Sequence, residues 1–249
     1  TMSLFKEAIN LIDTSLIVSS SFYIDIGDIS RKMGEKTFGY TCSPGVIACP
    51  DFGFDKWIET GVYTYEKTTQ EILEKSRIPH LISKLFWTGI LATQPLRYNL
   101  YEIAKNNGDK MEIIPADWIR KSPKGTFHGC TSYTSLSDHT KYKYLIDCGA
   151  GGYSGRVKFL LHTKRPLFLV DRTINKQEFF FKDLKPFIHY IPVKEDLSDL
   201  LEKIQWAETH ESEANQIAKN AQDFAVNNLN KPAVINFLKD QILTNIFEI

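Results

Sequence analysis

The sequence predicts an α/β protein built on parallel sheets. Segments with the pattern of β-strands alternate with segments of helical periodicity, most regularly between residues 84 and 247. Such alternation is typical of parallel strands joined by crossover helices. The chain has 249 residues, of which 43% are hydrophobic and 24% charged. That composition is ordinary for a globular protein, and the length allows one large domain or two small ones.

The first eighty residues predict short elements separated by long loops. We expect a helix, a strand, a loop region rich in glycine and proline, and a second helix, at residues 6–12, 15–26, 38–54 and 64–75. The strand is apolar and rich in β-forming residues, and it leads into a turn at Gly27 and Asp28. Together these elements would form an N-terminal lobe over residues 1–80.

From residue 81 onward the alternation of strands and helices becomes regular. Short apolar runs predict strands at residues 84–88, 142–147, 166–170 and 188–193. Helical patterns cover residues 97–106, 156–163, 196–206 and 211–227. We expect one lobe over residues 81–231. A last helix follows the break at Pro232, and residues 232–249 would pack back on the first lobe.

Charge and cysteine content argue against several classes of function. Thirty Lys and Arg balance thirty Asp and Glu, which gives no general attraction to nucleic acid or anionic lipid. Apolar runs such as residues 167–170 are too short to span a bilayer, and the N-terminus as it stands is not a signal peptide. The four cysteines, Cys42, Cys49, Cys130 and Cys148, have no zinc-site spacing. We interpret them as buried free thiols and expect a cytoplasmic protein without a bound metal.

The most informative segment is YLIDCGAGGYSGR at residues 144–156. A glycine-rich turn between a strand and a helix lets backbone N–H groups approach an anion. One interpretation is a dinucleotide or S-adenosylmethionine site with Asp171 as the ribose-binding acid, although the third glycine of that fingerprint falls on Tyr153. A second is a tight turn that only packs. The third, which we favour, is a diphosphate cradle completed by Arg156 and Lys158.

Several ordered blocks of the chain resemble glycosyltransferase family 90. The matching text is DHTKYKYLID at 138–147, YSGRVKFLL at 153–161, EFFF at 178–181, LKPFIHYIPV at 184–193, DLSDLL at 196–201 and IAKNAQDF at 217–224. The resemblance is good over residues 136–227, loose over residues 84–106 and poor over the first eighty. The family includes protein O-glucosyltransferases, capsule xylosyltransferases, lipopolysaccharide enzymes and a large-virus β-xylosyltransferase.

The resemblance implies a GT-B-type fold, in which two Rossmann-like lobes enclose a cleft and the C-terminal lobe holds the nucleotide. It also implies an inverting, metal-independent transfer from a UDP-sugar, with xylose ahead of glucose, to a hydroxyl of a glycan acceptor, without a cofactor. One departure stands out, because the family's aromatic-Arg-Gly strand end has Thr88 in place of the arginine. A non-catalytic binding module of the same fold therefore stays open as an alternative. A methyltransferase dependent on S-adenosylmethionine is the more distant one.

An inverting transfer needs a base for the acceptor proton and a cationic cradle for the leaving group. We predict Asp28 as the base, because it follows a strand at a glycine-containing turn, with Asp25 and Asp51 as the next choices. Arg156 is the first cradle residue. The other predicted substrate contacts are Gly89, Arg97, Lys143, Gly152, Tyr153, Ser154 and Glu178. Of these, Glu178 is predicted to contact the ribose.

Aromatic side chains in the two lobes have two interpretations. Phe52, Trp57 and Trp87 could form a platform for a sugar or a uracil ring, but such residues are more often part of the core. His189 lies among apolar residues of a predicted strand, and we interpret it as a core histidine rather than a catalytic one.

Overall fold

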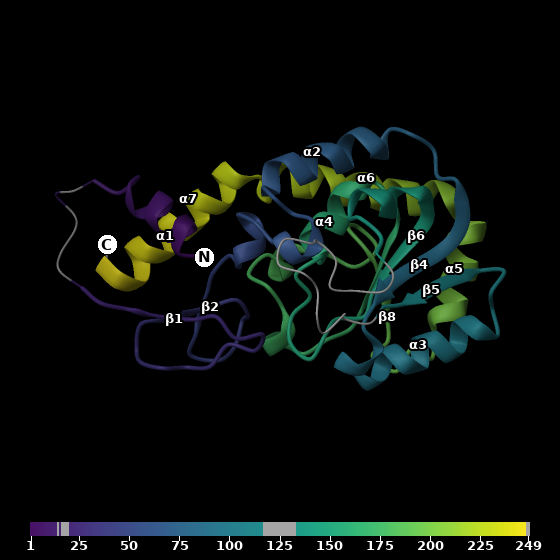
Figure 1. The fold of residues 1–249 in the computed structure, drawn as a ribbon, viewed down its shortest axis with the longest axis horizontal. Coiled ribbons are helices and arrows are strands. Elements are labelled where there is room, and N and C mark those ends of the chain that lie inside the picture. The colour runs from purple at the N-terminus through teal and green to yellow at the C-terminus, as the bar shows by residue number, and fades with distance from the viewer. Residues whose placement is uncertain (14, 16–19, 117–132, 248–249) are drawn as a thin grey trace.

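The chain folds into two lobes of unequal size that lie end to end along the long axis of the molecule (Figure 1). The computed structural model describes residues 1–13, 15, 20–116 and 133–247. The smaller lobe is built on a parallel sheet of three strands, in the order β1 (Tyr23–Asp25), β2 (Thr37–Gly39) and β3 (Ile47–Ala48). Helix α1 (Met2–Ile9) packs beside it. This lobe is much smaller than a full Rossmann-like lobe.

The larger lobe is a doubly wound sheet of five parallel strands. Its strands are β4 (Ile82–Gly89), β5 (Met111–Pro115), β6 (Tyr142–Asp147), β7 (Leu167–Val170) and β8 (Ile191–Val193), in the order β5-β4-β6-β7-β8. The order reverses between β4 and β6. In open α/β sheets the carboxyl ends of the strands form a ligand crevice at such a switch point.

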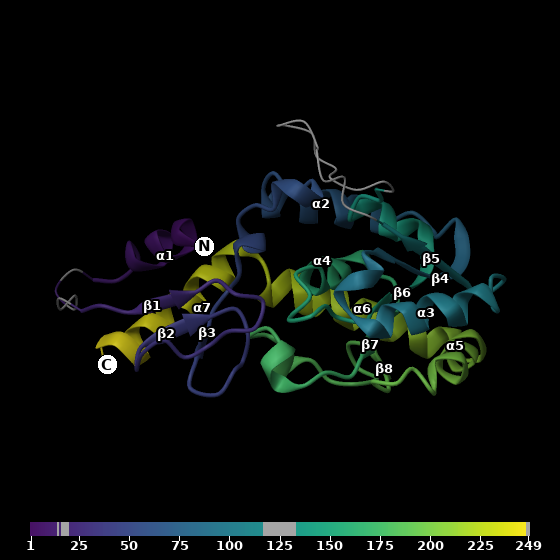
Figure 2. The ribbon, with the colours of Figure 1, turned by 60° about the horizontal axis from the view of Figure 1, so that its bottom comes forward.

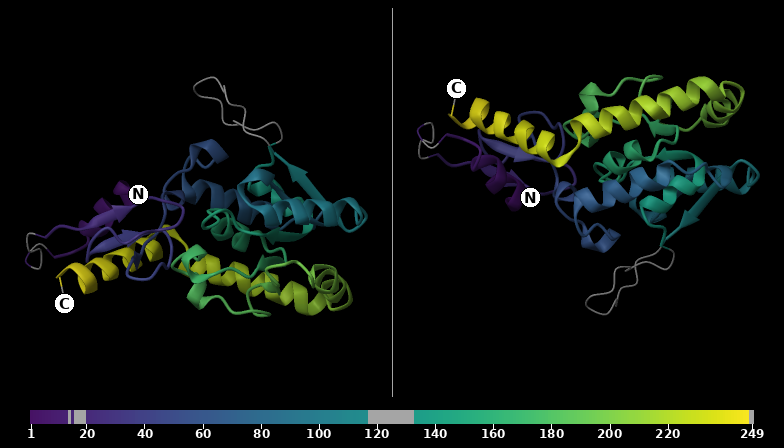
Figure 3. Two further views of the ribbon diagram at one scale, coloured as in Figure 1. Left: turned by 90° about the horizontal axis from the view of Figure 1, so that it is seen from below. Right: turned by 90° about the horizontal axis from the view of Figure 1, so that it is seen from above.

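In the described part of the chain, six further helices surround the sheet and connect the lobes. They are α2 (Tyr65–Ser76), α3 (Pro95–Lys105), α4 (Val157–Leu160), α5 (Leu200–Thr209), α6 (Glu211–Asn228) and α7 (Lys231–Ile242). Thr64 caps α2 by accepting a hydrogen bond from the Lys67 N–H at 3.2 Å. Figure 3 shows α6 running along the larger lobe and α7 continuing onto the smaller one, where it packs against α1.

Buried side chains form two hydrophobic clusters, one on each face of the large sheet. Along β6, Leu145 belongs to the first cluster, whereas Tyr144 and Ile146 belong to the second. This is the alternation that a strand imposes on its side chains. The first cluster extends from Leu4 and other residues of the small lobe to the interior of the large one. The two lobes therefore share one core and are not joined only by a flexible linker. Figure 2 shows α6 along the larger lobe and α7 beside the strands of the smaller one.

The α/β class with parallel sheets is confirmed, but several predicted elements differ. The strand expected at 15–26 covers only Tyr23–Asp25, and residues 16–19 lie outside the described part of the chain. Strands β2, β3 and β5 were not predicted, since runs of two to five residues carry too little periodicity and depend on their sheet partners. The helix expected at 156–163 is the single turn α4 followed by a 3₁₀ turn, Leu161–Thr163.

The start of the last helix and the state of the cysteines need one correction each. Helix α7 begins at Lys231 with Pro232 in its first turn, so the proline opens the helix rather than preceding it. Cys49 and Cys148 are buried free thiols, whereas Cys42 is half-buried and Cys130 lies outside the described residues. No helix within the described ranges is both long and apolar enough to cross a membrane.

Candidate functional site

A cavity of about 380 Å³ lies between the two lobes, beside the carboxyl end of β4. Its size falls within the range of small-molecule sites. The small lobe and the segment after it contribute Asp28, Phe52, Trp57, Glu59 and Thr60 to its wall. The opposite wall includes Thr88, Gly89, Arg97, Tyr153, Ser154 and Arg156 of the large lobe. The cavity therefore coincides with the switch point that the sheet order defines.

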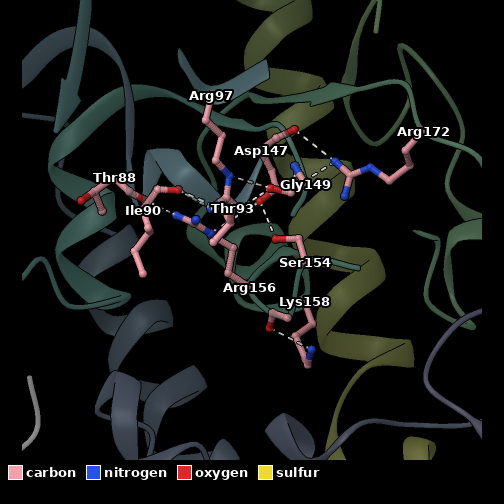
Figure 4. A network of polar contacts seen from close by, with 11 residues as sticks. Thr88, Ile90, Thr93, Arg97, Asp147, Gly149, Ser154, Arg156, Lys158 and Arg172 are labelled. Atoms are coloured by element: carbon pink, nitrogen blue, oxygen red, sulfur yellow. Dashed lines mark hydrogen bonds and ion pairs between the residues drawn. The ribbon is translucent and has the colours of Figure 1, made fainter. Parts of the chain in front are cut away.

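Asp147, at the end of β6, organises the floor of this region. Its carboxylate is fully buried and accepts hydrogen bonds from the Gly149 N–H at 3.0 Å and the Ser154 hydroxyl at 2.7 Å. It also pairs with Arg172 Nη2 at 2.9 Å and with Arg156 Nε at 3.5 Å (Figure 4). Burial alone would raise the pKa of Asp147, but the two guanidinium groups and Ser154 outweigh it and lower the pKa. We call Asp147, Arg156 and Arg172 the Asp147 cluster.

Arg156 is held in place but keeps part of its guanidinium available to a ligand. Its Nη1 donates to the Thr88 carbonyl at 2.6 Å, and the guanidinium lies 5.4 Å from the centre of the Trp87 ring. Over the described residues, its Nη2 makes no hydrogen bond. A Cβ added to Gly89 would lie 3.1 Å from this Nη2 and 2.9 Å from the Trp87 ring. The glycine therefore leaves the donor accessible from the cavity, where an anion could accept it.

Arg97 borders the cavity, but its donors are committed to the protein backbone. Its Nε donates to the Gly149 carbonyl at 3.0 Å and its Nη1 to the Ile90 carbonyl at 2.8 Å. Nη1 also contacts the Thr93 hydroxyl, and Nη2 the Gly149 carbonyl. Burial, and next the charge of Arg156, lowers the pKa of Arg97. The geometry therefore gives Arg97 the task of holding the glycine loop, residues 149–155, more directly than that of contacting substrate.

Gly152 is a point at which the two lobes touch through their backbones. A Cβ at this position would lie 2.1 Å from the carbonyl oxygen of Asp28. The next N–H, that of Tyr153, donates to the same oxygen at 3.2 Å. Tyr153 lines the cavity with its buried ring, whereas the Ser154 hydroxyl is used by Asp147. The absence of a side chain at Gly152 thus lets the Asp28 turn rest on the glycine loop.

Of the three candidate bases, Asp28 alone lines the cavity, and it is exposed. The Asp25 carboxylate shapes the preceding turn, because it accepts the Gly27 N–H at 2.9 Å and the Arg31 N–H at 2.6 Å. Asp51 is buried and accepts from Lys158 at 3.0 Å. The geometry thus favours Asp28 as the carboxylate that can meet a ligand.

Two predicted substrate contacts lie away from the cavity. Lys143 is near the amino end of β6, opposite to the switch point, and pairs with Glu211 at 2.9 Å. Glu178 is only 2% exposed and pairs with Lys158 at 2.8 Å. Burial raises the pKa of Glu178 to about 7, although Lys158 opposes the shift. The nucleotide contact predicted for Lys143 and the ribose contact predicted for Glu178 therefore find no support in where these residues lie.

Two residues at the site were missed as ligand-site residues. Asp147 ends the strand predicted at residues 142–147, and that place was the available signal for it. His139 borders the cavity, is 3% exposed and holds the Ser135 carbonyl with Nδ1 at 2.8 Å. Burial lowers the pKa of His139 to about 4. The hydrogen bond to Ser135 opposes this shift, and the charge of Arg156 adds to it. The ring is therefore neutral at pH 7. It belongs to the block DHTKYKYLID.

Comparisons with known proteins agree with the sequence blocks. The model of glycosyl transferase family 90 matches residues 38–245. The chain is 34% identical to Protein O-glucosyltransferase 2 of Danio rerio over 145 residues, which are 58% of this chain and 28% of that protein. It is 40% identical to Protein O-glucosyltransferase 1 of Homo sapiens over 143 residues, 55% of this chain and 35% of that protein. The chain thus spans about a third of these curated relatives.

Two solved structures resemble the chain more distantly. The Anabaena protein Alr3699/HepE in complex with UDP has a TM-score of 0.43 and 10% sequence identity, covering 70% of this chain and 44% of that one. A Rickettsia africae glycosyltransferase gives a TM-score of 0.40 at 13% identity, over 71% of this chain and 45% of that one.

Proposed function

Because the chain belongs to glycosyl transferase family 90, we propose that it transfers a sugar from a UDP-sugar to a hydroxyl of a glycan acceptor. The proposal includes inversion at the anomeric carbon and no requirement for a metal ion or a cofactor. One observation carries it: the cavity has an accessible guanidinium N–H from Arg156 on one wall and the exposed carboxylate of Asp28 on the other.

These two groups suit the two ends of an inverting displacement. The acceptor oxygen attacks the anomeric carbon from the face opposite to the diphosphate, and the bond from that carbon to the diphosphate oxygen breaks. Asp28 takes the proton of the acceptor hydroxyl as the new bond forms. Arg156 donates to the leaving diphosphate, whose negative charge grows in the transition state. Asp147 and the Thr88 carbonyl hold that guanidinium in position before the reaction begins.

The donor that we propose is UDP-xylose, with UDP-glucose as the next choice. The small first lobe and the direct backbone contact at Gly152 favour a compact sugar. The first experiment is a donor hydrolysis screen across uridine and guanosine diphosphate sugars, accompanied by calorimetry with UDP. Failure of UDP to bind at millimolar concentration would remove the enzyme hypothesis, and binding of S-adenosylmethionine instead would support the methyltransferase alternative.

Asp28→Asn tests the base. The amide keeps the shape of the side chain but cannot take a proton, so transfer should fall by about 10²–10⁴-fold while UDP affinity is unchanged. Asp25→Asn is the comparison variant, because Asp25 lies in the same turn but does not line the cavity, and its carboxylate accepts hydrogen bonds from the Gly27 and Arg31 N–H groups. If Asp25→Asn loses transfer and Asp28→Asn keeps it, the base is misassigned.

A second candidate function is a nucleotide-binding module without turnover, which Thr88 in place of an arginine favours. Thr88 uses its hydroxyl to bond the Ile114 carbonyl at 3.0 Å. However, Arg156 reaches the Thr88 carbonyl and so brings a guanidinium to the same strand end. A protein that binds UDP in the calorimeter but neither hydrolyses nor transfers any donor would support the module.

A further inference from the structure

A second ion cluster lies beside the glycine loop, and its three side chains do not line the cavity. Lys158, on α4, is fully buried and donates to three oxygens, which account for all three of its N–H groups. They are Asp51 Oδ2 at 3.0 Å, Glu178 Oε1 at 2.8 Å and the Gly155 carbonyl at 2.8 Å. We call Lys158, Asp51 and Glu178 the Lys158 cluster.

Lys158 contacts one segment from each wall of the cavity. The Gly155 carbonyl belongs to the glycine loop and directly precedes Arg156. Asp51 lies 107 residues earlier and starts the 3₁₀ turn Phe52–Phe54, accepting the Gly53 N–H at 2.9 Å. Phe52 lines the opposite wall of the cavity and packs edge-on against Trp57, with 5.8 Å between ring centres.

The packing around the Lys158 cluster leaves little room for movement. A Cβ on Gly155 would lie 3.1 Å from the Trp57 ring and 3.5 Å from Asp51 Oδ2. A Cβ on Gly53 would lie 3.2 Å from Lys158 Cε. Burial, and next the charges of Asp51 and Glu178, raise the pKa of Tyr153, which lines the cavity. A shift of Asp51 would therefore be felt at both walls.

Stability alone does not account for this arrangement. Two buried carboxylates share one ammonium, and Glu178 Oε2 has no hydrogen-bond partner among the described residues. Buried ion pairs often contribute little to stability compared with apolar packing, and an unsatisfied buried oxygen adds a further cost. The Lys158 cluster costs free energy to bury, yet it links two walls of the cavity. This suggests that it fixes the geometry of those walls.

We propose that Lys158 is a positioning residue, which holds the Phe52–Trp57 wall in register with the glycine loop through its contact with Asp51. This inference rests on the proposed transfer activity and extends it: the wall presents the acceptor, and the loop presents the donor. Effective orientation of two reactants supplies a large part of a rate enhancement, and a misplacement of about 1 Å can cost about 10²-fold.

The two carboxylates of the Lys158 cluster provide a matched pair of variants. Both are 2% exposed and both contact the same ammonium, but only Asp51 begins the turn that carries Phe52. Glu178 follows β7, outside the cavity wall. In Asp51→Asn the side-chain oxygen can still accept the Gly53 N–H, while the amide nitrogen replaces the oxygen that pairs with Lys158. Glu178→Gln removes one negative charge beside the same ammonium and leaves the cavity wall unchanged.

The experiment compares transfer with donor hydrolysis by water in the full chain, using UDP-xylose and UDP-glucose. Asp51→Asn should lower the ratio of transfer to hydrolysis about 10-fold or more, with UDP affinity unchanged. Glu178→Gln should leave the ratio at the wild-type value. Asp51→Asn should also keep the acidic limb of the pH–rate profile, which loss of a general base would remove.

Three results would overturn the inference. They are an unchanged ratio in Asp51→Asn, an equal fall in both variants, and loss of the acidic limb, which would make Asp51 the base. Asp51→Asn combined with Lys158→Gln and Glu178→Gln leaves no buried charge in the cluster, and it should show the same fall if the single variant does not fold. Failure of the wild-type chain to bind UDP would instead count against the proposed function.

Discussion

The two ion clusters that flank the glycine loop are opposite in composition and in accessibility. The Asp147 cluster has two guanidinium groups around one carboxylate, and part of Arg156 remains open to the cavity. The Lys158 cluster has two carboxylates around one ammonium and is closed on all sides. The loop between them thus has one neighbour that can meet an anionic ligand and another that can only hold protein together. The comparison separates binding charges from positioning charges within a few residues of sequence.

The largest effect is expected when the ammonium of the Lys158 cluster is removed. Lys158→Met would leave Asp51 and Glu178 buried without a counter-charge, and the free energy of unfolding should fall by about 3–5 kcal/mol. Urea unfolding followed by circular dichroism measures this, with the exposed Lys182→Met as the control. Adding Asp51→Asn and Glu178→Gln should restore most of the loss. A single variant as stable as the wild type would show that the buried charges are not coupled.

Removing the Arg156 guanidinium from the Asp147 cluster should affect UDP binding more than folding. Arg156→Ala deletes a charge-assisted contact to the diphosphate, so UDP binding should weaken by about 1.5–3 kcal/mol, and transfer should fall further. Arg156→Lys should rescue only part, because an ammonium lacks the planar fork of a guanidinium. Calorimetry and kcat/KM give the two quantities. Wild-type UDP affinity in the alanine variant would eliminate Arg156 as a diphosphate contact.

The Lys158 cluster should also make the free energy of unfolding depend on pH. Burial raises the pKa of Glu178 from 4.5 to about 7, so between these values the folded state holds a proton that the unfolded state has lost. Stability should therefore fall as the pH rises from about 4.5 to about 7. Glu178→Gln should remove this dependence and be more stable at pH 8, by on the order of 1 kcal/mol. Thermal unfolding from pH 5 to pH 8 tests it, and parallel curves for both proteins would contradict it.

The smallest effect is expected from chelation. If Arg156 and the glycine loop neutralise the leaving diphosphate, a divalent cation is not needed for that task. Among the residues that the structure describes, no group of three or more His, Cys, Asp or Glu side chains is placed to hold a metal ion. Activity should therefore be unchanged in EDTA. Loss on chelation, followed by recovery with manganese, would mean that a metal supplies the positive charge.

How much of the site could be predicted depended on how local each signal was. Arg156 and Asp28 each follow a turn at the end of a strand, which nearby residues already indicate, and both line the cavity. The Lys158 cluster depends on the fold, because its carboxylates are 107 and 20 residues away from the lysine. Arg97 is the converse case. Its place near the start of a helix could be predicted from the sequence, but the backbone carbonyls that accept its hydrogen bonds could not.

The same distinction holds for the fold. The large sheet could be predicted, apart from β5, because its strands are apolar runs between clear helices. Strands β2 and β3, of three and two residues, are too short for their sequence to distinguish them from loops. Only their pairing within the sheet defines them, and that pairing is a property of the folded chain.

The contact at Gly152 limits how the cavity can change its width. At this point the Asp28 turn rests directly on the glycine loop, and there is no side chain whose rotation could make room. A bulkier ligand would have to push the lobes apart, which breaks the hydrogen bond from Tyr153 to Asp28 and opens the core that the lobes share. The range of ligands that fit is thus governed by the stiffness of the whole molecule, and substitutions far from the cavity that loosen the shared core should broaden it.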